Sequence, residues 1–309
     1  MVTEQRRAGD GAPARPPISV TVSTGQGWAD IRKAILTTIE SVREVGGQVV
    51  VTDSSDTPPP GPEILGDDVI WARYPGESVF QLRVRGYQLA TGELVAVTED
   101  HVEVPRDWAR RLIEAHAAHP EAVAIGGSVL NGATSTIIDW ASFLVVQSAV
   151  AAPIRSGPAR RLSGAVNVCY RRSAIEHIDA HHGLGAMDGL HQRQLADAGA
   201  VMLNDDSIRV SHVQEIGWRG TTAGHYNAAR TMSSFRRLAL TPVDVIRIVG
   251  ALFVPLARYV VTVRRLAPRG YGPQLLRCTP AILWLLYVQG WGQFLGYLAG
   301  PGDSPGKVQ

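Results

Sequence analysis

The chain has 309 residues, of which 45% are hydrophobic and 19% are charged, and its formal net charge is +2 at pH 7. This length accommodates one large α/β domain with an appendage, or two modest domains, and the small charge gives no support for a nucleic-acid partner. Two cysteines, Cys169 and Cys278, cannot form a disulfide framework, and no Cys/His cluster indicates structural zinc, so a reducing compartment fits best.

The first 17 residues, MVTEQRRAGDGAPARPP, lack the apolar core of a signal peptide and are predicted to be a disordered tail. From residue 18 onward strand and helix patterns alternate, which predicts a mostly parallel sheet flanked by helices. Strands are expected at residues 18–23, 48–53 and 69–74, with helices near 28–45 and 78–90. The loop SSDTPPPGP after the second strand contains too many prolines to form a helix.

The fourth predicted strand ends in an unusual polar group, within the stretch GELVAVTEDHVEVP at residues 92–105. A β-branched run stops there at Glu99, Asp100 and His101. Alternate residues of an extended segment point to one side, so Glu99 and His101 are expected to converge while Asp100 faces away. Two interpretations stay open: a metal site at the carboxyl edge of the sheet, or a turn that leads into the next helix and is capped by Asp100.

The pattern continues with a helix from Pro105 to His116 and a buried strand at residues 122–130. A strand-like GAVNVCY follows, then helices around 173–178 and 188–198. The chain returns through VML and IRVSH to His212. The globular part is expected to end near Arg237, and no internal repeat is found.

Residues 238–302 are predicted to form a helical tail associated with a membrane. No charged residue lies between Cys278 and Gly302, a length that could span a bilayer, although glutamines and glycines weaken that interpretation. Before it, at residues 245–266, Arg247, Arg258 and Arg265 share one stripe of a helix that Pro255 is expected to kink. A basic stripe on an apolar helix suits an anionic membrane surface; a core helix with exposed arginines is the alternative. Residues 303–309 are expected to be disordered.

Several motifs carry a resemblance to a known family. VVVTDSSD is similar to a strand-end DxSxD nucleotide motif, and LRVRGYQLATGELVAVTEDHVEVPRDW to the segment that contains a metal motif and ends in P-x-x-W. LSGAVNVCYRRSAI is similar to an acceptor-side segment, MDGLHQRQLADAG to an ED-x-E-L motif, and VSH to a strand that closes the site. In this order, over residues 18–237, they resemble a family-2 glycosyltransferase. The resemblance implies the GT-A fold, a mixed and mostly parallel α/β sheet flanked by helices.

The resemblance implies a nucleotide site and a metal site. The residues implied to bind the nucleotide are Asp53, Asp56, Arg83, Glu99 and Asp100. The metal is implied to be held by His101, with Glu99 and His212 in support. Because imidazole is a softer ligand than carboxylate, Mn²⁺ is expected in preference to Mg²⁺. Taken alone, Asp53 equally fits an Asx turn that opens the proline-rich loop, and His212 fits a structural histidine.

The resemblance also implies an acceptor site, lined by Gly164, Asn167 and Arg171. Asp188 is the implied general base that takes the proton from an acceptor hydroxyl. Without the resemblance, Asp188 could be an N-terminal helix cap, and Arg171 could belong to a solvated helix lead.

The implied activity is metal-dependent, inverting transfer of a sugar from a nucleotide-diphosphate sugar to a lipid-linked or cell-envelope glycan acceptor, at the cytoplasmic face of the cell membrane. The departures from the family pattern leave a second interpretation open: a non-catalytic, membrane-tethered relative that binds a nucleotide sugar or a glycan. The positions that depart from the pattern are Val84, Glu99, His101, Met187 and Gln194. A nucleotidyltransferase is disfavoured, because no Gly-rich basic loop follows the first strand.

Overall fold

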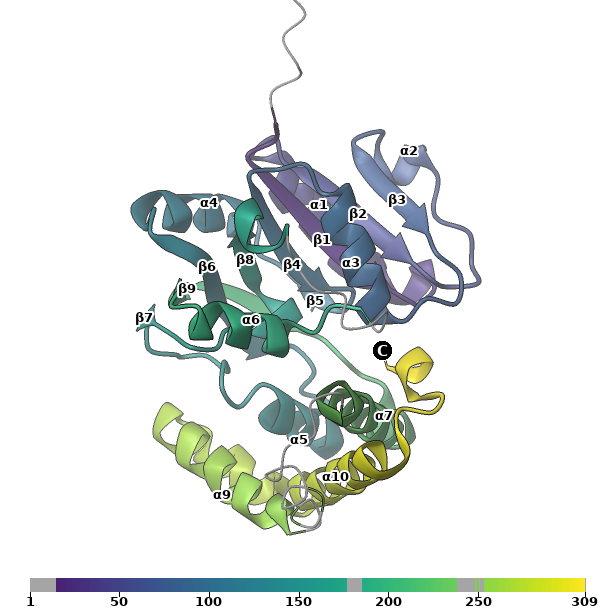
Figure 1. Cartoon of the computed structure of the whole chain (residues 1–309), viewed down its shortest axis with the longest axis vertical. Helices are drawn as coiled ribbons and strands as arrows, with labels where there is room; N and C mark the ends of the chain where they lie inside the picture. Colours follow the sequence, from purple (N-terminus) through teal and green to yellow (C-terminus); the bar gives the residue numbers. More distant parts are fainter. Residues whose placement is uncertain (1–14, 177–184, 238–247, 249, 251–252, 309) are drawn as a thin grey trace, which may run out of the picture.

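The structure of the chain is a computed structural model that describes residues 15–176, 185–237, 248, 250 and 253–308. It shows one sheet with helices on both faces and a layer of helices at one end (Figure 1). Most of the predicted N-terminal tail, the end of the helix predicted at 173–178, and Arg247 of the predicted basic stripe lie outside the described residues.

The sheet is mixed and mostly parallel, as predicted, and its strand order is β3-β2-β1-β4-β8-β6-β9-β5, with β7 paired to β9. The parallel half consists of β1 (Ile18–Thr24), β2 (Gln48–Asp53), β3 (Val69–Arg73) and β4 (Leu94–Glu99). The other half consists of β5 (Val102–Glu103), β6 (Ala122–Asn131), β7 (Gly157–Pro158), β8 (Val168–Arg171) and β9 (Val201–His212). The central strands are apolar, β-branched runs because both faces of the sheet are covered.

Two layers of helices cover the faces of the sheet. On one face, α1 (Trp28–Arg43) buries its apolar residues against β1 and β2, and α4 (Trp108–Ala118) packs against β6 and β9. On the other face lie α3 (Val79–Leu89) and α6 (Asp188–Asp197). A capping box formed by Ser78 and Gln81 fixes the start of α3, because each side chain hydrogen-bonds the other's backbone N–H. The short α2 (Pro62–Leu65) lies between β2 and β3.

The segment predicted as a separate tail packs onto the rest of the molecule. A layer formed by α5 (Ile137–Val146), α7 (Gly217–Arg237), α9 (Val254–Leu266) and α10 (Gly272–Ala299) lies below the sheet in Figure 1. Leu275, Ile282 and Leu285 of α10 belong to the same buried core as the first strand and α1. The expected boundary at residue 238 therefore does not separate two cores, and α5 was not predicted.

The helical layer corrects one further expectation. Pro255 lies in the first turn of α9, where a proline needs no hydrogen-bonded N–H, so it begins a helix and does not kink one. Within the described ranges, no helix combines the length and the apolar character needed to cross a membrane.

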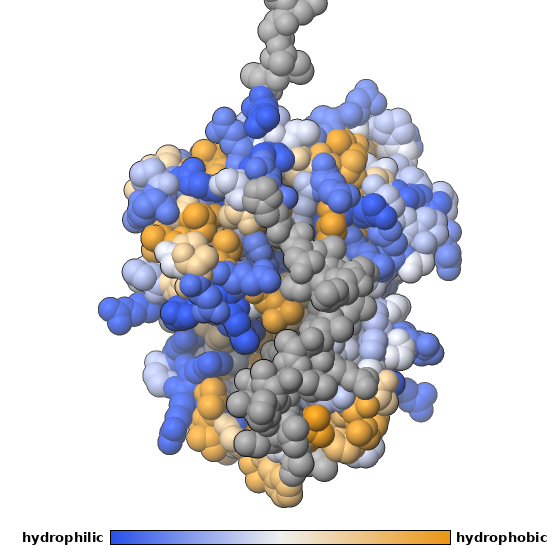
Figure 2. Space-filling view, in the orientation of Figure 1, coloured by the Kyte–Doolittle hydropathy of each residue, from blue (hydrophilic) through white to orange (hydrophobic). Residues whose placement is uncertain are grey.

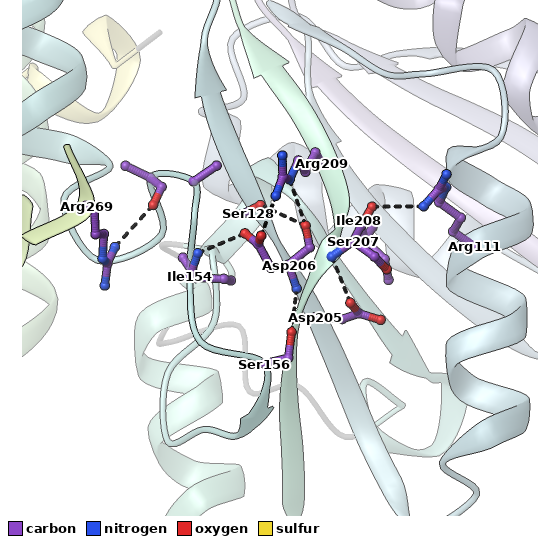
Figure 3. A network of polar contacts seen from close by, with 12 residues as sticks. Arg111, Ser128, Ile154, Ser156, Asp205, Asp206, Ser207, Ile208, Arg209 and Arg269 are labelled. Carbon is purple, nitrogen blue, oxygen red and sulfur yellow. Dashed lines mark hydrogen bonds and ion pairs between the residues drawn. The ribbon is translucent and has the colours of Figure 1, made fainter. Parts of the chain in front are cut away.

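Strand β9, predicted as two segments, is one strand with a bulge. Between the pairs Gly127–Asp205 and Ser128–Arg209, β6 advances by one residue while β9 advances by four. The backbone N–H of Ile154 donates to Asp206 Oδ1 at 2.8 Å, and the N–H of Asp206 donates to the Ser156 hydroxyl at 2.9 Å (Figure 3). These contacts hold the extra residues in one conformation.

Candidate functional site

The candidate site lies at the carboxyl edge of the parallel strands, where ligands bind in open α/β sheets. The register of the sheet aligns Thr24 with Asp53 and Ser23 with Glu99, so the ends of β1, β2 and β4 meet at this edge. All three strands end in polar residues there.

Glu99, His101 and His212 form a cluster whose ligand atoms all lie within 4.8 Å of one another. His101 Nε2 is 3.0 Å from His212 Nε2 and 3.4 Å from Glu99 Oε2, and His212 Nε2 is 3.7 Å from the same carboxylate oxygen. Antiparallel pairing of β5 with β9 sets Val102 opposite His212 and brings the second histidine to the first. The expected convergence of Glu99 and His101 is thus observed.

Asp100 turns away from this cluster, as expected, but it is not free. Its Oδ1 lies 2.8 Å from His101 Nδ1, and its Oδ2 accepts a hydrogen bond from the Thr24 hydroxyl at 2.6 Å. A carboxylate on Nδ1 fixes the orientation of the ring and leaves Nε2 directed at Glu99 and His212, the arrangement that orients metal-binding histidines. Both oxygens of Asp100 therefore have partners within the protein, and its contact with a nucleotide stays a prediction.

The electrostatics of the cluster keep His101 protonated on both ring nitrogens and positively charged. Although burial opposes its charge, hydrogen bonds with Asp100 and Glu99 raise the pKa of His101 to about 10. Burial also opposes the charge of Glu99, but the hydrogen bond from His101 and the neighbouring positive charges lower its pKa to about 2. Burial and the charge on His101 lower the pKa of His212 to about 3. A cation at this place would displace the His101 proton.

The chemistry of these donors fits a divalent metal ion. Two imidazole nitrogens and one carboxylate oxygen on the same side of the edge form a donor set that first-row divalent ions accept. The hydrogen bond that His101 Nδ1 donates to the Asp100 carboxylate supplies the orienting contact that metal-binding histidines have. Mn²⁺ as the bound ion stays a prediction.

A cavity of about 320 Å³ opens beside the cluster. It is lined by the ends of β1 and β4, the start of α3, and side chains that include Arg83, Glu99, Asp100 and His101. Arg83 brings a guanidinium to this cavity: its Nη1 lies 3.0 Å from Asp188 Oδ2 and its Nη2 lies 3.5 Å from Glu99 Oε1. Burial disfavours its charge, yet the two carboxylates raise the pKa of Arg83 above its usual value.

Asp188 is the first residue of α6 and lies across Arg83 from Glu99. Its carboxylate pairs with Arg83, and the Tyr87 hydroxyl lies 3.4 Å from its Oδ1. It does not cap the helix, because Met187 occupies the N-cap position and no side chain caps α6. A Cβ atom built at Gly164 would lie 3.9 Å from the Cβ of Asp188, so the structure brings these two predicted residues together.

Two residues predicted for the acceptor site have other partners in this structure. Asn167 is fully buried; it donates to the carbonyls of Ser128 and Ile208 and accepts from Trp108 Nε1 at 2.9 Å. Strand β8 runs antiparallel to β4 and pairs Arg171 with Leu94, the first residue of β4. Arg171 therefore lies at the opposite edge of the sheet, where it donates to backbone carbonyls, among them those of His116 and Ala122.

The nucleotide motif on β2 also has internal partners. Asp53 is buried, and its carboxylate accepts from the Ser55 N–H at 2.6 Å and from Trp71 Nε1 at 3.0 Å. The first contact is the Asx turn that the sequence left open as an alternative. Asp56 is exposed in the turn that follows, and Ser54, between the two acids, lines the cavity.

Sequence reasoning missed one wall of the cavity. Residues 303–309 were expected to be disordered, but Ser304–Lys307 form a short 3₁₀ helix, and Pro305, Gly306 and Val308 line the cavity. The segment is ordered because Ser304 is buried and Val308 packs against Phe80 and Met187. Apart from Pro305, nothing in the composition of this segment indicated a defined conformation.

Comparisons with known proteins agree with this fold. No family model matches the sequence. Over 66 residues, 21% of this chain, the sequence is 30% identical to a glucosyl-dolichyl phosphate glucuronosyltransferase from Haloferax volcanii, and the match spans about one fifth (21%) of that relative's length. The structure of the mannosyltransferase PcManGT from Pyrobaculum calidifontis, in complex with GDP-Man and Mn²⁺, superimposes with a TM-score of 0.52 at 16% identity, covering 93% of this chain and 88% of that one. The predicted glycosyltransferase fold is confirmed.

Proposed function

We propose that this protein is a metal-dependent, inverting glycosyltransferase that uses a nucleotide-diphosphate sugar. The observation that carries the proposal is the cluster of Glu99, His101 and His212 at the end of β4, beside a cavity that contains Arg83. The solved mannosyltransferase with the same fold binds GDP-Man and Mn²⁺, which supports a metal-bound nucleotide sugar as the donor here. Mn²⁺ is the proposed ion and Mg²⁺ the second choice.

The cluster and Arg83 would receive the diphosphate of the donor. A divalent ion held by His101, His212 and Glu99 supplies Lewis-acid neutralisation of the leaving diphosphate. Arg83 points its guanidinium at two carboxylates, Glu99 and Asp188. A diphosphate that enters the cavity adds a third anion, which competes for the same guanidinium.

Asp188 is the proposed general base. Its carboxylate is buried behind Arg83, so an acceptor hydroxyl reaches it when Arg83 turns to the diphosphate and releases a carboxylate oxygen. Gly164, which has no side chain, leaves room for the acceptor beside Asp188. The acceptor oxygen then attacks the anomeric carbon, its proton passes to Asp188, and the bond to the diphosphate breaks on the opposite side, which inverts the anomeric configuration.

We propose a lipid-linked acceptor at a membrane surface. The name of the archaeal relative specifies glucosyl-dolichyl phosphate, a sugar carried by a lipid. Binding of the protein at a membrane surface is also supported by the exposed apolar side chains of α10, which are Leu276, Trp284, Tyr287, Trp291 and Leu298. At about 100° per residue they fall within a stripe about 80° wide, which we call the outer stripe of α10.

The outer stripe has the composition of an interfacial helix. Leu276 is 81% exposed and Trp291 is 50% exposed, and tryptophan and tyrosine prefer the level of the lipid headgroups. Figure 2 shows hydrophobic side chains gathered at the end of the molecule that α9 and α10 form in Figure 1. Residues 245–302 contain six arginines and no aspartate or glutamate, so this end favours an anionic leaflet, such as the cytoplasmic face of the cell membrane.

The test is an assay of donor binding and nucleotide release. Purified full-length protein is incubated with GDP-mannose, UDP-glucose or UDP-glucuronate, with and without Mn²⁺, and with dolichyl phosphate or glucosyl-dolichyl phosphate in vesicles as the acceptor. Mn²⁺-dependent release of the nucleoside diphosphate, lost in Asp188→Asn, is the expected result. Tight binding without turnover, unchanged in that variant, would instead identify a non-catalytic binding protein.

A further inference from the structure

The chain returns to the candidate site after α10. Residues 301–308 follow the end of that helix and place Pro305, Gly306 and Val308 in the wall of the cavity, together with His101 and Arg83. In Figure 1 the short 3₁₀ helix of this segment lies beside the lower end of α3. We call residues 301–308 the return segment.

One end of the return segment is docked on an apolar contact. Val308 packs against Phe80 at the start of α3 and Met187 just before α6, both of which are buried. Met187 directly precedes Asp188, at a position where the resemblance leads one to expect an acid. The apolar side chain at this position therefore has a structural partner, because it receives the return segment at the edge of the cavity.

The other end is fixed by α7. Arg230 Nε donates to the carbonyl of Gly300 at 3.0 Å. Gly302 has a φ of +51°, a backbone conformation that favours glycine, and it lies against the Arg230 guanidinium. Between the two anchors Ser304 is buried, whereas Gly306 is exposed and faces open space.

We propose that the return segment is a binding element for the nucleotide-diphosphate sugar, which covers the bound donor and contacts it around Gly306. This inference rests on the proposed function. The cavity measures about 320 Å³ with the segment in place, at the lower end of the roughly 300–1,000 Å³ of small-molecule sites. A donor of full size therefore touches this wall. Gly306 lets the donor approach the backbone, since no side chain intervenes.

The experiment places a single reactive thiol in the segment. Both native cysteines, Cys169 and Cys278, are buried, so a maleimide should label Gly306→Cys selectively. Gly272→Cys is the matched control, because Gly272 also faces open space but lies at the far end of α10. With saturating GDP-mannose or UDP-glucose and Mn²⁺, labelling of Gly306→Cys should slow about tenfold, whereas labelling of Gly272→Cys should not change.

A second pair of variants measures affinity. Gly306→Phe should weaken binding of the same donor about tenfold, because the ring occupies space that the donor needs, and Gly272→Phe should bind as the wild type does. If the wild type binds a donor by calorimetry but neither labelling nor affinity responds at Gly306, the return segment has no such role and the proposed function stands. If the wild type binds no nucleotide sugar with Mn²⁺, the proposed function fails, and this inference fails with it.

Discussion

Replacing Asp100 by asparagine should weaken Mn²⁺ binding although Asp100 is not a proposed ligand. The carboxylate accepts from His101 Nδ1 at 2.8 Å and from the Thr24 hydroxyl at 2.6 Å. Asparagine keeps the shape and one acceptor oxygen but loses the negative charge that holds the proton on Nδ1 and increases the basicity of Nε2. Loss of such an orienting carboxylate typically costs about 10- to 100-fold in metal affinity.

The expected loss corresponds to about 1.4–2.7 kcal/mol of binding free energy. Thr24→Val removes one hydrogen bond from the same carboxylate but leaves its charge, and should cost less, about 1 kcal/mol. A larger loss of Mn²⁺ affinity in Asp100→Asn than in Thr24→Val would show that the charge of Asp100 matters more than its hydrogen bond from Thr24 of β1.

The assay is titration with Mn²⁺, followed by calorimetry or by the electron paramagnetic resonance signal of the free ion. Glu103→Gln is the matched control: it removes one negative charge two residues from His101, from a carboxylate that pairs with Lys33 at 2.8 Å. An unchanged dissociation constant in Asp100→Asn, or an equal loss in Glu103→Gln, would refute the orienting role of Asp100.

Three further predictions concern catalysis, membrane binding and stability. Asp188→Asn should lower nucleotide release about 10²- to 10⁴-fold in a steady-state assay and leave Mn²⁺ binding intact; equal activity in Asp188→Asn and the control Asp197→Asn would contradict the general base. Leu276→Glu should reduce sedimentation with phosphatidylcholine–phosphatidylglycerol vesicles without changing the melting temperature, and undiminished sedimentation would remove the outer stripe of α10 as the binding surface. Burial lowers the pKa of His116 to about 4, so its neutral form stabilises the fold above pH 6.5, and about 3 kcal/mol should be lost as the pH falls from 6.5 towards 4. In His116→Gln, the free energy of unfolding measured with urea should fall less steeply over this pH range than in the wild type. The same pH dependence in both proteins would contradict the assignment of this loss to His116.

The sequence predicted the sheet and the cluster well because both depend on local patterns. Apolar β-branched runs marked the strands, and the register of β1 and β4 then brought Glu99 to the carboxyl edge. The convergence of Glu99 and His101 needs only the period of a strand and the rule that ligands bind at the carboxyl edge. His212 was implied by the resemblance alone, and the pairing of β9 with β5 brings it to the cluster.

The errors concern direction and tertiary contact. Nothing local showed that β8 runs antiparallel, and that reversal carries Arg171 to the opposite edge of the sheet. The apolar run of α10 resembled a helix that crosses a membrane, because a helix buried on one face and apolar on the other has no clear period. One side of α10, with Leu275 and Ile282, packs on the core, so only its outer stripe is left for the membrane surface that we propose. Likewise, a motif cannot show that Asn167 is saturated by Trp108, Ser128 and Ile208.

The bulge in β9 decides the chemistry of the cluster from a distance. If pairing continued regularly from Gly127–Asp205, the residue opposite Asn131 would be Arg209, whereas the structure has His212 there. Arginine is a permanent cation and offers no lone pair to a metal. Three residues of extra backbone, held by Ile154 and Ser156, thus place the proposed ligand His212 where a regular strand would place Arg209. If the proposed metal site is correct, insertions or deletions between residues 205 and 208 in related chains should remove or restore the ligand opposite Asn131 without any substitution in the motifs.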